Sequence, residues 1–224
     1  MSHSHQFKML AFDWDGTLFD STALIALSIQ DAVRDLGEDP PTLEEARWVI
    51  GMELNSALAK VAPNLSPKAY ADLANRYRYH YLRRQEDIVF FDGVIPMLQG
   101  LKERGFLLAV ATGKSRRGLD HLLKCHDLQD LFHDSRTADE TAGKPNPLML
   151  EELMQVWDVL PNQLLMIGDT SHDLQMAYNA NSPSLAVTYG AHAEQELRAW
   201  NPLAVLDSIA DVDMWLSSQA GRVE

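Results

Sequence analysis

Asp13-Trp14-Asp15-Gly16-Thr17-Leu18 directly follows the short apolar run Met9-Leu10-Ala11-Phe12. Such a run is typical of a buried strand, so the two acids stand where the strand ends and a loop begins. In open α/β sheets, ligands bind at that edge. One carboxylate could attack phosphorus and the other could handle a proton, while the following backbone N–H groups receive phosphate oxygens. We expect Trp14 to point away from both acids, because neighbours on an extended segment alternate.

The composition of the chain limits its partners. Its 224 residues are 46% hydrophobic and 23% charged, enough for one large domain or for a core with a smaller appendage. The formal net charge of -13 argues against nucleic acid and against anionic membranes as partners. A small anionic substrate is compatible with this charge, because a bound cation can invert the local field.

Cysteine content and apolar runs bear on localisation. The sequence holds 1 cysteine, Cys125, which excludes an internal disulfide and fits a reducing compartment. We expect this side chain on the core-facing side of a helix. No apolar stretch approaches the ~18 residues needed to span a bilayer, and the N-terminal segment lacks the apolar part of a signal peptide. These observations predict a cytoplasmic protein without a membrane partner.

Residues from about 20 to 88 are predicted to be helical. Apolar residues recur at helical spacing up to Gly37, which ends the first helix. Thr42-Leu43-Glu44-Glu45 has the capping-box pattern of a second helix, which Gly51 stops. A third helix follows around 54–61, and Ser66-Pro67 predicts the start of a fourth with Ser66 as its N-cap.

From Phe90 onward, strand and helix patterns alternate. The apolar runs that predict strands are 106–111, 164–167 and 184–188, with shorter candidates at 132–135 and 203–206. Alternation of this kind predicts an α/β fold with a doubly wound parallel sheet, a Rossmann-like core, and an inserted four-helix cap domain. We expect the catalytic core to comprise residues 1–19 and 89–224, and the helical cap domain residues 20–88.

Two further segments place anion-binding groups at strand ends or helix starts. Thr112-Gly113-Lys114 ends the run 106–111, and a hydroxyl with backbone N–H groups at that place favours an anion site. Gly143-Lys144-Pro145-Asn146-Pro147 opens a helix, and its prolines keep the loop stiff, so that Lys144 can neutralise charge from a constrained position. Taken alone, the first segment also fits a plain turn, and Lys144 also fits an exposed loop lysine.

A second pair of acids follows the run 164–167, in Gly168-Asp169-Thr170-Ser171-His172-Asp173. The carboxylates of Asp169 and Asp173, together with Asp13, offer the hard oxygen ligands that Mg²⁺ prefers. Asp173 alternatively caps the following helix, or does both. We expect His172 to lie at the surface.

In this order, the four segments resemble the signatures of the haloacid dehalogenase superfamily of phosphotransferases, and the resemblance covers essentially the whole chain. Asp13 to Leu18 is similar to the first signature, Thr112 to the second, Lys144 to the third, and Asp169 with Asp173 to the fourth. A helical insertion directly after the first signature is similar to members with a four-helix cap. The stretches most similar to the phosphoglycolate phosphatase-like group are Phe19-Asp20-Ser21, Phe91-Asp92-Gly93-Val94 and Gly143-Lys144-Pro145.

The resemblance implies a Mg²⁺-dependent phosphatase for a small phosphorylated metabolite, with a phosphoglycolate-like substrate favoured. It implies that Asp13 becomes an aspartyl phosphate and that Asp15 protonates the leaving alcohol, then deprotonates water. The implied Mg²⁺ ligands are Asp13, the backbone carbonyl of Asp15, and Asp169, with Asp173 supporting. The implied phosphate-binding residues are Gly16, Thr112, Gly113 and Lys144, of which Lys144 also restrains Asp13.

Other functions stay open on the sequence. A sugar-phosphate mutase would share the acid pair, and a non-catalytic module that responds to phosphate or Mg²⁺ would also gather acids at strand ends. Dehalogenases of the superfamily lack the second acid, so Asp15 argues against carbon–halogen chemistry. Within the cap, Gly51-Met52-Glu53 is either a loop that sets specificity or a plain turn. We expect a monomer or a weak homodimer.

Overall fold

The computed structural model describes residues 7–85 and 88–219, and its centre is a parallel six-stranded sheet in the order β3-β2-β1-β4-β5-β6. The strands are β1 (Met9–Phe12), β2 (Leu107–Thr112), β3 (Asp134–Thr137), β4 (Leu164–Gly168), β5 (Ser184–Val187) and β6 (Ala204–Leu206). The chain runs from β1 outward to β2 and β3, then returns to the other side of β1 with β4. The sheet therefore has a topological switch point between β1 and β4, where such folds bind ligands.

The central strand β1 is buried on both faces, which explains its unbroken apolar run. Leu10 and Phe12 belong to one hydrophobic cluster, and Met9 and Ala11 belong to another. Because successive side chains of a strand point to opposite faces, these clusters are the two sides of the sheet.

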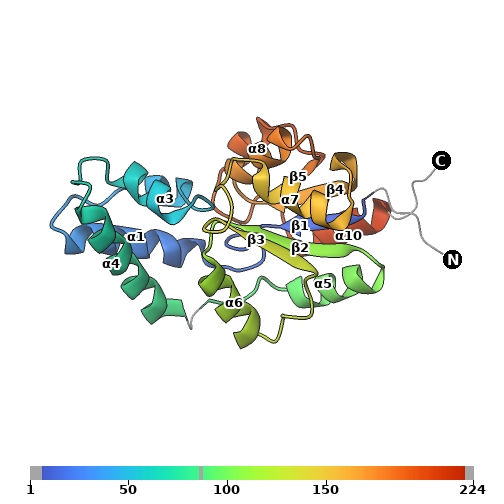
Figure 1. Cartoon of the computed structure of the whole chain (residues 1–224), viewed down its shortest axis with the longest axis horizontal. Coiled ribbons are helices and arrows are strands. Elements are labelled where there is room, and N and C mark those ends of the chain that lie inside the picture. Colours follow the sequence, from blue (N-terminus) through green and yellow to red (C-terminus); the bar gives the residue numbers. More distant parts are fainter. Residues whose placement is uncertain (1–6, 86–87, 220–224) are drawn as a thin grey trace.

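Helices cover both faces (Figure 1). One cluster takes apolar side chains from α5 (Val94–Glu103), α6 (Arg116–Cys125) and α10 (Ile209–Gln219), and the other takes them from α7 (Leu148–Trp157) and α8 (Ser171–Asn179). Two further helical segments are short. The 3₁₀ turn Pro161–Gln163 precedes β4, and α9 (Glu194–Arg198) follows β5. The predicted doubly wound α/β sheet is confirmed.

The chain between β1 and α5 forms a helical block, which lies to one side of the sheet in Figure 1. Its helices are α1 (Thr22–Asp35), α2 (Leu43–Trp48), α3 (Leu54–Val61) and α4 (Ala69–Arg84). They enclose two hydrophobic clusters of their own. One cluster takes buried side chains from α1, α2 and α3, and the other takes them from α1, α3 and α4. The division into domains at 19/20 and 88/89 stays a prediction.

Several local predictions can be compared with the structure. The capping box at Thr42 is confirmed, because its hydroxyl accepts the Glu45 N–H while the Glu45 carboxylate accepts the Thr42 N–H. The prediction of Ser66 as the N-cap of α4 is wrong: Ser66 accepts the Ala69 N–H in a turn, and Lys68 is the N-cap. Strand β3 begins at Asp134, two positions later than the pattern indicated.

Two findings bear on the expectations from composition. Cys125 is exposed, whereas α6 turns Leu119 and Leu122 into the core, so the core-facing expectation for the thiol is wrong. Its Sγ instead lies 3.6 Å from Nε2 of His121, one turn earlier. Within residues 7–85 and 88–219, no helix has the length and apolar character required to traverse a bilayer.

Trp14 points away from the acids, as predicted, and is completely buried in the aromatic part of the sheet's core. Its ring stacks on Phe19 at 5.1 Å between centroids and contacts Phe90 and Phe132 at 6.2 and 6.0 Å. This packing fixes the backbone between Asp13 and Asp15.

We predict that Trp14→Ala lowers the free energy of unfolding by about 3–5 kcal/mol, because it leaves a large cavity in a fully buried cluster. The matched control is Met214→Ala, since Met214 is 70% exposed and a surface truncation changes stability by about 0.5 kcal/mol or less. Urea unfolding measures both variants. Similar losses for the two would contradict the assigned packing.

Candidate active site

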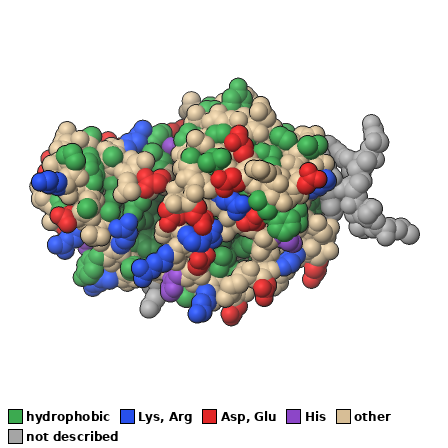
Figure 2. All heavy atoms as spheres, viewed as in Figure 1, with side chains coloured by type: hydrophobic (Ala, Val, Ile, Leu, Met, Phe, Trp, Pro, Cys, Tyr) green, Lys and Arg blue, Asp and Glu red, His purple; other side chains and the backbone are tan. Residues whose placement is uncertain are grey.

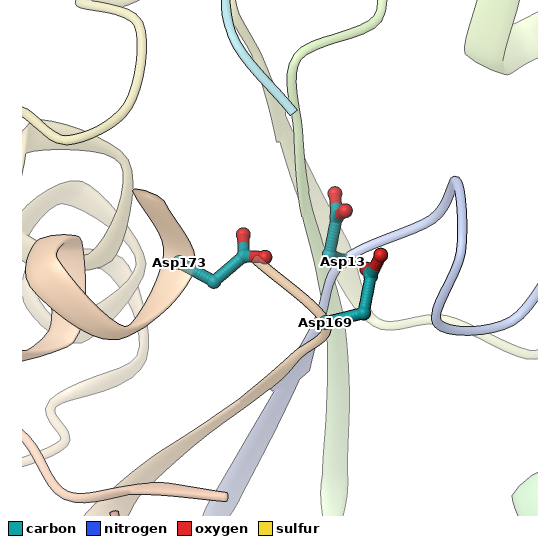
Figure 3. A group of neighbouring side chains, drawn as sticks. All are labelled: Asp13, Asp169 and Asp173. Atoms are coloured by element: carbon teal, nitrogen blue, oxygen red, sulfur yellow. The ribbon is translucent and has the colours of Figure 1, made fainter. Parts of the chain in front are cut away.

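The acidic residues meet at the switch point of the sheet. Asp13 follows the last residue of β1, Asp169 follows the last residue of the neighbouring strand β4, and Asp173 lies in the first turn of α8. Figure 3 shows the three carboxylates pointing into one region, with Asp173 reaching across from its helix. All three residues are buried, and one carboxylate oxygen of each lies within 4.8 Å of the others. Neighbouring parallel strands place them there because their carboxyl ends share an edge.

Lys144 reaches into this acidic cluster. Its Nζ lies 2.6 Å from Oδ1 of Asp13 and 2.5 Å from Oδ1 of Asp173, and its side chain is fully buried. The alternative of an exposed loop lysine, which the segment fits when taken alone, is therefore wrong, and the restraint on Asp13 implied by the resemblance is present. Lys144 belongs to the loop before α7, so three separate segments of the chain are joined by this one ammonium group.

Burial dominates the electrostatics of the cluster. It raises the pKa of Asp13, with a contribution in the same direction from the charges of Asp173 and Asp169, while Lys144 acts against it. Burial and the charge of Asp173 raise the pKa of Asp169 to about 7. Burial opposes the charge of Lys144, but Asp13 and Asp173 outweigh it and raise the pKa of the lysine. The raised pKa values of Asp13 and Asp169 show that one lysine does not fully compensate the ionisation of this buried cluster.

The residues present fit a divalent cation. Three carboxylates against one ammonium leave an excess of two negative charges when all are ionised. Oδ2 of Asp13 is buried and has no hydrogen-bond partner in the described structure. Carboxylate oxygens without thiolates or imidazoles in the group are the donor set of Mg²⁺ and Ca²⁺. The unpartnered Oδ2 of Asp13 could coordinate a metal ion at this place, and the charge of that ion would offset the excess negative charge.

Asp169 is oriented by a shell of main-chain and hydroxyl donors. Its Oδ1 accepts the Thr17 hydroxyl at 2.7 Å and its Oδ2 accepts the Ala191 N–H at 2.7 Å. Gly16 and Gly190 press against the same carboxylate so closely that a Cβ at either position would overlap it. Gly16 has φ +85°, and its N–H donates to the Phe19 carbonyl at 2.8 Å. Its N–H is therefore engaged within the loop, and a role of Gly16 in phosphate binding stays a prediction.

Asp173 caps the following helix, as one of the two predicted roles requires, and its role as a metal ligand stays a prediction. Its Oδ2 accepts the Thr170 hydroxyl at 2.7 Å and the Thr170 N–H at 3.1 Å, which completes a capping box at the start of α8. Its Oδ1 is the atom that pairs with Lys144. The helix start therefore fixes the rotamer of a residue in the acidic cluster.

Asp15 lies beside the cluster and is held from two sides. Its Oδ1 accepts the Ser21 hydroxyl at 2.6 Å, and its Oδ2 forms an ion pair of 2.9 Å with Nζ of Lys114. Thr112, buried at the end of β2, accepts the Lys114 N–H through its Oγ1 at 3.2 Å. The Lys114–Asp15 ion pair thus joins the loop after β1 to the loop after β2, a contact that neither sequence motif indicates.

A cleft of about 600 Å³ opens in front of these residues. Asp13, Asp15, Thr112 and Gly113 line it from the sheet side, and apolar residues of the helical block line it opposite. Figure 2 shows a hollow between the helical block and the rest of the molecule, with hydrophobic side chains inside it. The loop Gly51-Met52-Glu53 belongs to the lining, and a Cβ on Gly113 would meet the carbonyls of Gly51 and Met52 at 2.6 Å. The part of this loop in specificity stays a prediction.

Sequence reasoning missed several contributors to the site. The pattern Thr112-Gly113-Lys114 indicates an anion site but assigns no separate role to Lys114, and no pattern assigns a role to Ser21, although Lys114 lies two positions after Thr112 and Ser21 six after Asp15. The Ala191 N–H could not be found, because a backbone donor leaves no signature. His172 is buried, not at the surface as expected: its Nε2 lies 2.9 Å from the Trp48 carbonyl, at the contact between α8 and the helical block.

The chain is similar to known phosphatases over most of its length. Residues 10–187 match the model of a family described as haloacid dehalogenase-like hydrolase. A phosphoglycolate phosphatase from Mannheimia succiniciproducens is 30% identical over 218 residues, which cover 92% of this chain and 97% of the relative. A pyrophosphatase PpaX from Bacillus cereus is 28% identical over 203 residues, which cover 90% and 92% respectively.

The fold also has close counterparts among solved structures. A putative beta-phosphoglucomutase from Bacteroides vulgatus superposes with a TM-score of 0.85 at 23% identity, over 98% of this chain and 92% of the other. The likeness extends over the helical block as well as the sheet, because nearly all of both chains takes part.

We predict that Gly190→Ala weakens Mg²⁺ binding by about 10- to 100-fold, the usual effect of disturbing the groups that orient a metal ligand. The new methyl group overlaps the Asp169 carboxylate and must displace it. Calorimetric titration with Mg²⁺ measures the change. Gly100→Ala is the control: no atom lies within 4 Å of a Cβ there, so its affinity should match that of the unmodified protein. Unchanged affinity in Gly190→Ala would show that Asp169 is not a ligand.

Proposed function

Because the chain belongs to the haloacid dehalogenase-like hydrolase family, we propose that it is a Mg²⁺-dependent phosphatase acting through an aspartyl phosphate on Asp13. The family and the phosphoglycolate phosphatase relatives indicate a phosphoric monoester hydrolase. The metal, the intermediate and the substrate are the parts that we propose. Phosphoglycolate, the substrate that the relatives' names give, is the favoured small phosphorylated metabolite.

The observation that carries the proposal is the joint position of Asp13 and Asp15 in one cleft, with the acidic cluster behind them. Lys144 grips only Oδ1 of Asp13, and Oδ2 has no hydrogen-bond partner among the described residues. The carboxylate is thus held in one rotamer while keeping lone pairs for reaction. Phosphoryl transfer depends mainly on such positioning and on charge neutralisation.

Each residue then has a definite task. Asp13 attacks phosphorus, and the alkoxide leaves with a proton from the protonated form of Asp15. The Asp15 carboxylate next removes a proton from the water that attacks the aspartyl phosphate, which releases phosphate and restores Asp13. Thr112, the Gly113 N–H and Lys144 would receive the phosphoryl oxygens. Mg²⁺, held by Asp13, Asp169 and the Asp15 carbonyl with Asp173 in support, would neutralise charge between the nucleophile and the phosphate.

A mutase differs from this scheme only in the fate of the phosphoryl group. It would return the group from Asp13 to a second hydroxyl of a sugar phosphate, so water would have to be kept out. The mutase named among the structural neighbours shares the fold, which does not separate the two outcomes. The appearance of inorganic phosphate, as against an isomerised sugar phosphate, separates them directly.

We predict that the protein releases phosphate from p-nitrophenyl phosphate with Mg²⁺, that chelation stops the reaction, and that added Mg²⁺ restores it. Asp13→Asn should abolish turnover without unfolding the protein, because the change is nearly isosteric and removes one of several repelling charges. Asp20→Asn is the matched control, since Asp20 is an exposed residue of the same connection and its loss should leave the rate unchanged. Full activity without divalent ions, or in Asp13→Asn, would refute the mechanism.

A second prediction concerns Asp15. Asp15→Asn should slow hydrolysis of alkyl phosphates by about 10²–10⁴-fold, the scale of a positioned proton donor. The loss should be much smaller for p-nitrophenyl phosphate, whose leaving group departs without a proton. Steady-state kinetics over a series of leaving groups measures this dependence. Equal losses across the series would assign Asp15 a structural role.

A further inference from the structure

Lys114 has a place in the cleft that the proposed reaction leaves unexplained. Its Nζ lies 2.9 Å from Oδ2 of Asp15 and 3.0 Å from the hydroxyl of Tyr81, which comes from α4 of the helical block. The same ammonium stands 4.9 Å from the centre of the Tyr81 ring. Burial opposes the charge of Lys114, but Asp15, Tyr81 and Tyr77 outweigh it and raise the pKa of the lysine. The group is a permanent cation on the wall of the cleft.

The phosphoryl group does not need this cation. Lys144 already contacts the proposed nucleophile Asp13, and Thr112 with Gly113 stands at the end of β2, the strand next to β1. Lys114 instead faces Asp15, the residue proposed to meet the leaving alcohol. Its charge is therefore directed at the part of the substrate that departs.

The rest of the cleft offers few alternatives for an anion at that place. The helical block contributes an apolar wall, made of Ile25, Ile29, Val49, Ile50 and Ala57. The other arginine and lysine side chains in the described lining, Arg78 and Arg117, belong to exposed residues at the rim. The side chain of Lys114 is only 12% exposed, so a charge pair made with it would be weakly screened.

Asp15 can give up this lysine and keep its position. Its other oxygen accepts the Ser21 hydroxyl at 2.6 Å, and Ser21 is fully buried at the start of α1. Tyr81 would continue to hold Lys114 from the opposite side. The resting ion pair therefore neutralises both charges until a second anion arrives.

We infer that Lys114 is a specificity-determining residue that binds a second anionic group, a carboxylate or a phosphoryl group, on the leaving part of the substrate. This inference rests on the proposed function and narrows its substrate class to phosphate esters or anhydrides that carry another negative charge near the scissile bond. Phosphoglycolate carries a carboxylate and pyrophosphate a second phosphoryl group, so the substrates named for the two relatives share this property.

The test compares 2-phosphoglycolate with its uncharged amide, 2-phosphoglycolamide, which keeps the phosphate and the carbon skeleton. We expect the unmodified protein to prefer the acid in kcat/KM, and Lys114→Met to reduce that preference by about 10- to 100-fold, as for a lost hydrogen bond between charged groups. Lys114→Arg should retain most of the preference. Arg117→Met, which removes a cation at the rim, should leave the preference intact.

A binding measurement accompanies the kinetics. Calorimetry measures the affinity for 2-phosphoglycolate of two variants that should not turn it over, Asp13→Asn and the double variant Asp13→Asn with Lys114→Met. The double variant should bind 2-phosphoglycolate about 10- to 100-fold more weakly than Asp13→Asn. An equal loss for acid and amide would overturn the inference and leave Lys114 as a positioning residue for Asp15. Loss of the preference in Arg117→Met instead would also overturn it. Failure of the protein to turn over any monoester would refute the proposed function, while the binding comparison would still decide on Lys114.

Discussion

The buried ammonium of Lys144 between Asp13 and Asp173 is the interaction on which the site depends. Desolvating a carboxylate is costly, and a second one nearby adds repulsion, so a fully buried acidic cluster needs a cation to persist. Lys144 joins the loop after β1, the loop before α7 and the first turn of α8 through a single atom. It offsets only part of the negative charge, and the remainder is what makes the cluster suited to a divalent ion.

The parts of this arrangement that were predictable from sequence are those with local signals. An apolar run followed by polar residues indicates a strand end, and parallel strands bring their carboxyl ends to one edge of the sheet. This argument predicts that the strand ends carrying Asp13, Thr112 and Asp169 share one edge, as they do in the structure. The capping box at Thr42 is equally local. A local signal that fits two structures gave a wrong prediction at Ser66. The pair Ser66-Pro67 fits a helix start, but it belongs to a turn that precedes the N-cap Lys68.

The parts that were not predictable depend on partners far away in sequence. The Lys114–Asp15 pair joins two loops, and neither residue reveals the other. The Ala191 N–H reaches Asp169 from a loop after β5, a contact that any residue type could make through its backbone. His172 was expected at the surface, but it is buried against the helical block, where its Nε2 lies near the Trp48 carbonyl. Burial of this kind follows from how two parts of the chain meet.

The same loops that hold the acidic cluster also carry the contacts to the helical block. His192, next to Ala191, accepts the Ser171 N–H on Nδ1 at 3.0 Å, so its proton is on Nε2, which donates to the Trp48 carbonyl at 2.9 Å. Arg47 donates to the carbonyl of Gly190 at 2.9 Å, immediately beside the Asp169 carboxylate. A movement of α2 would therefore pull on the loop whose Ala191 N–H orients Asp169. A movement of α4 would pull Tyr81 from Lys114 and thus act on Asp15. Through these contacts the position of the helical block is coupled to the geometry of Asp169 and Asp15, the acids that we propose for metal binding and for proton transfer.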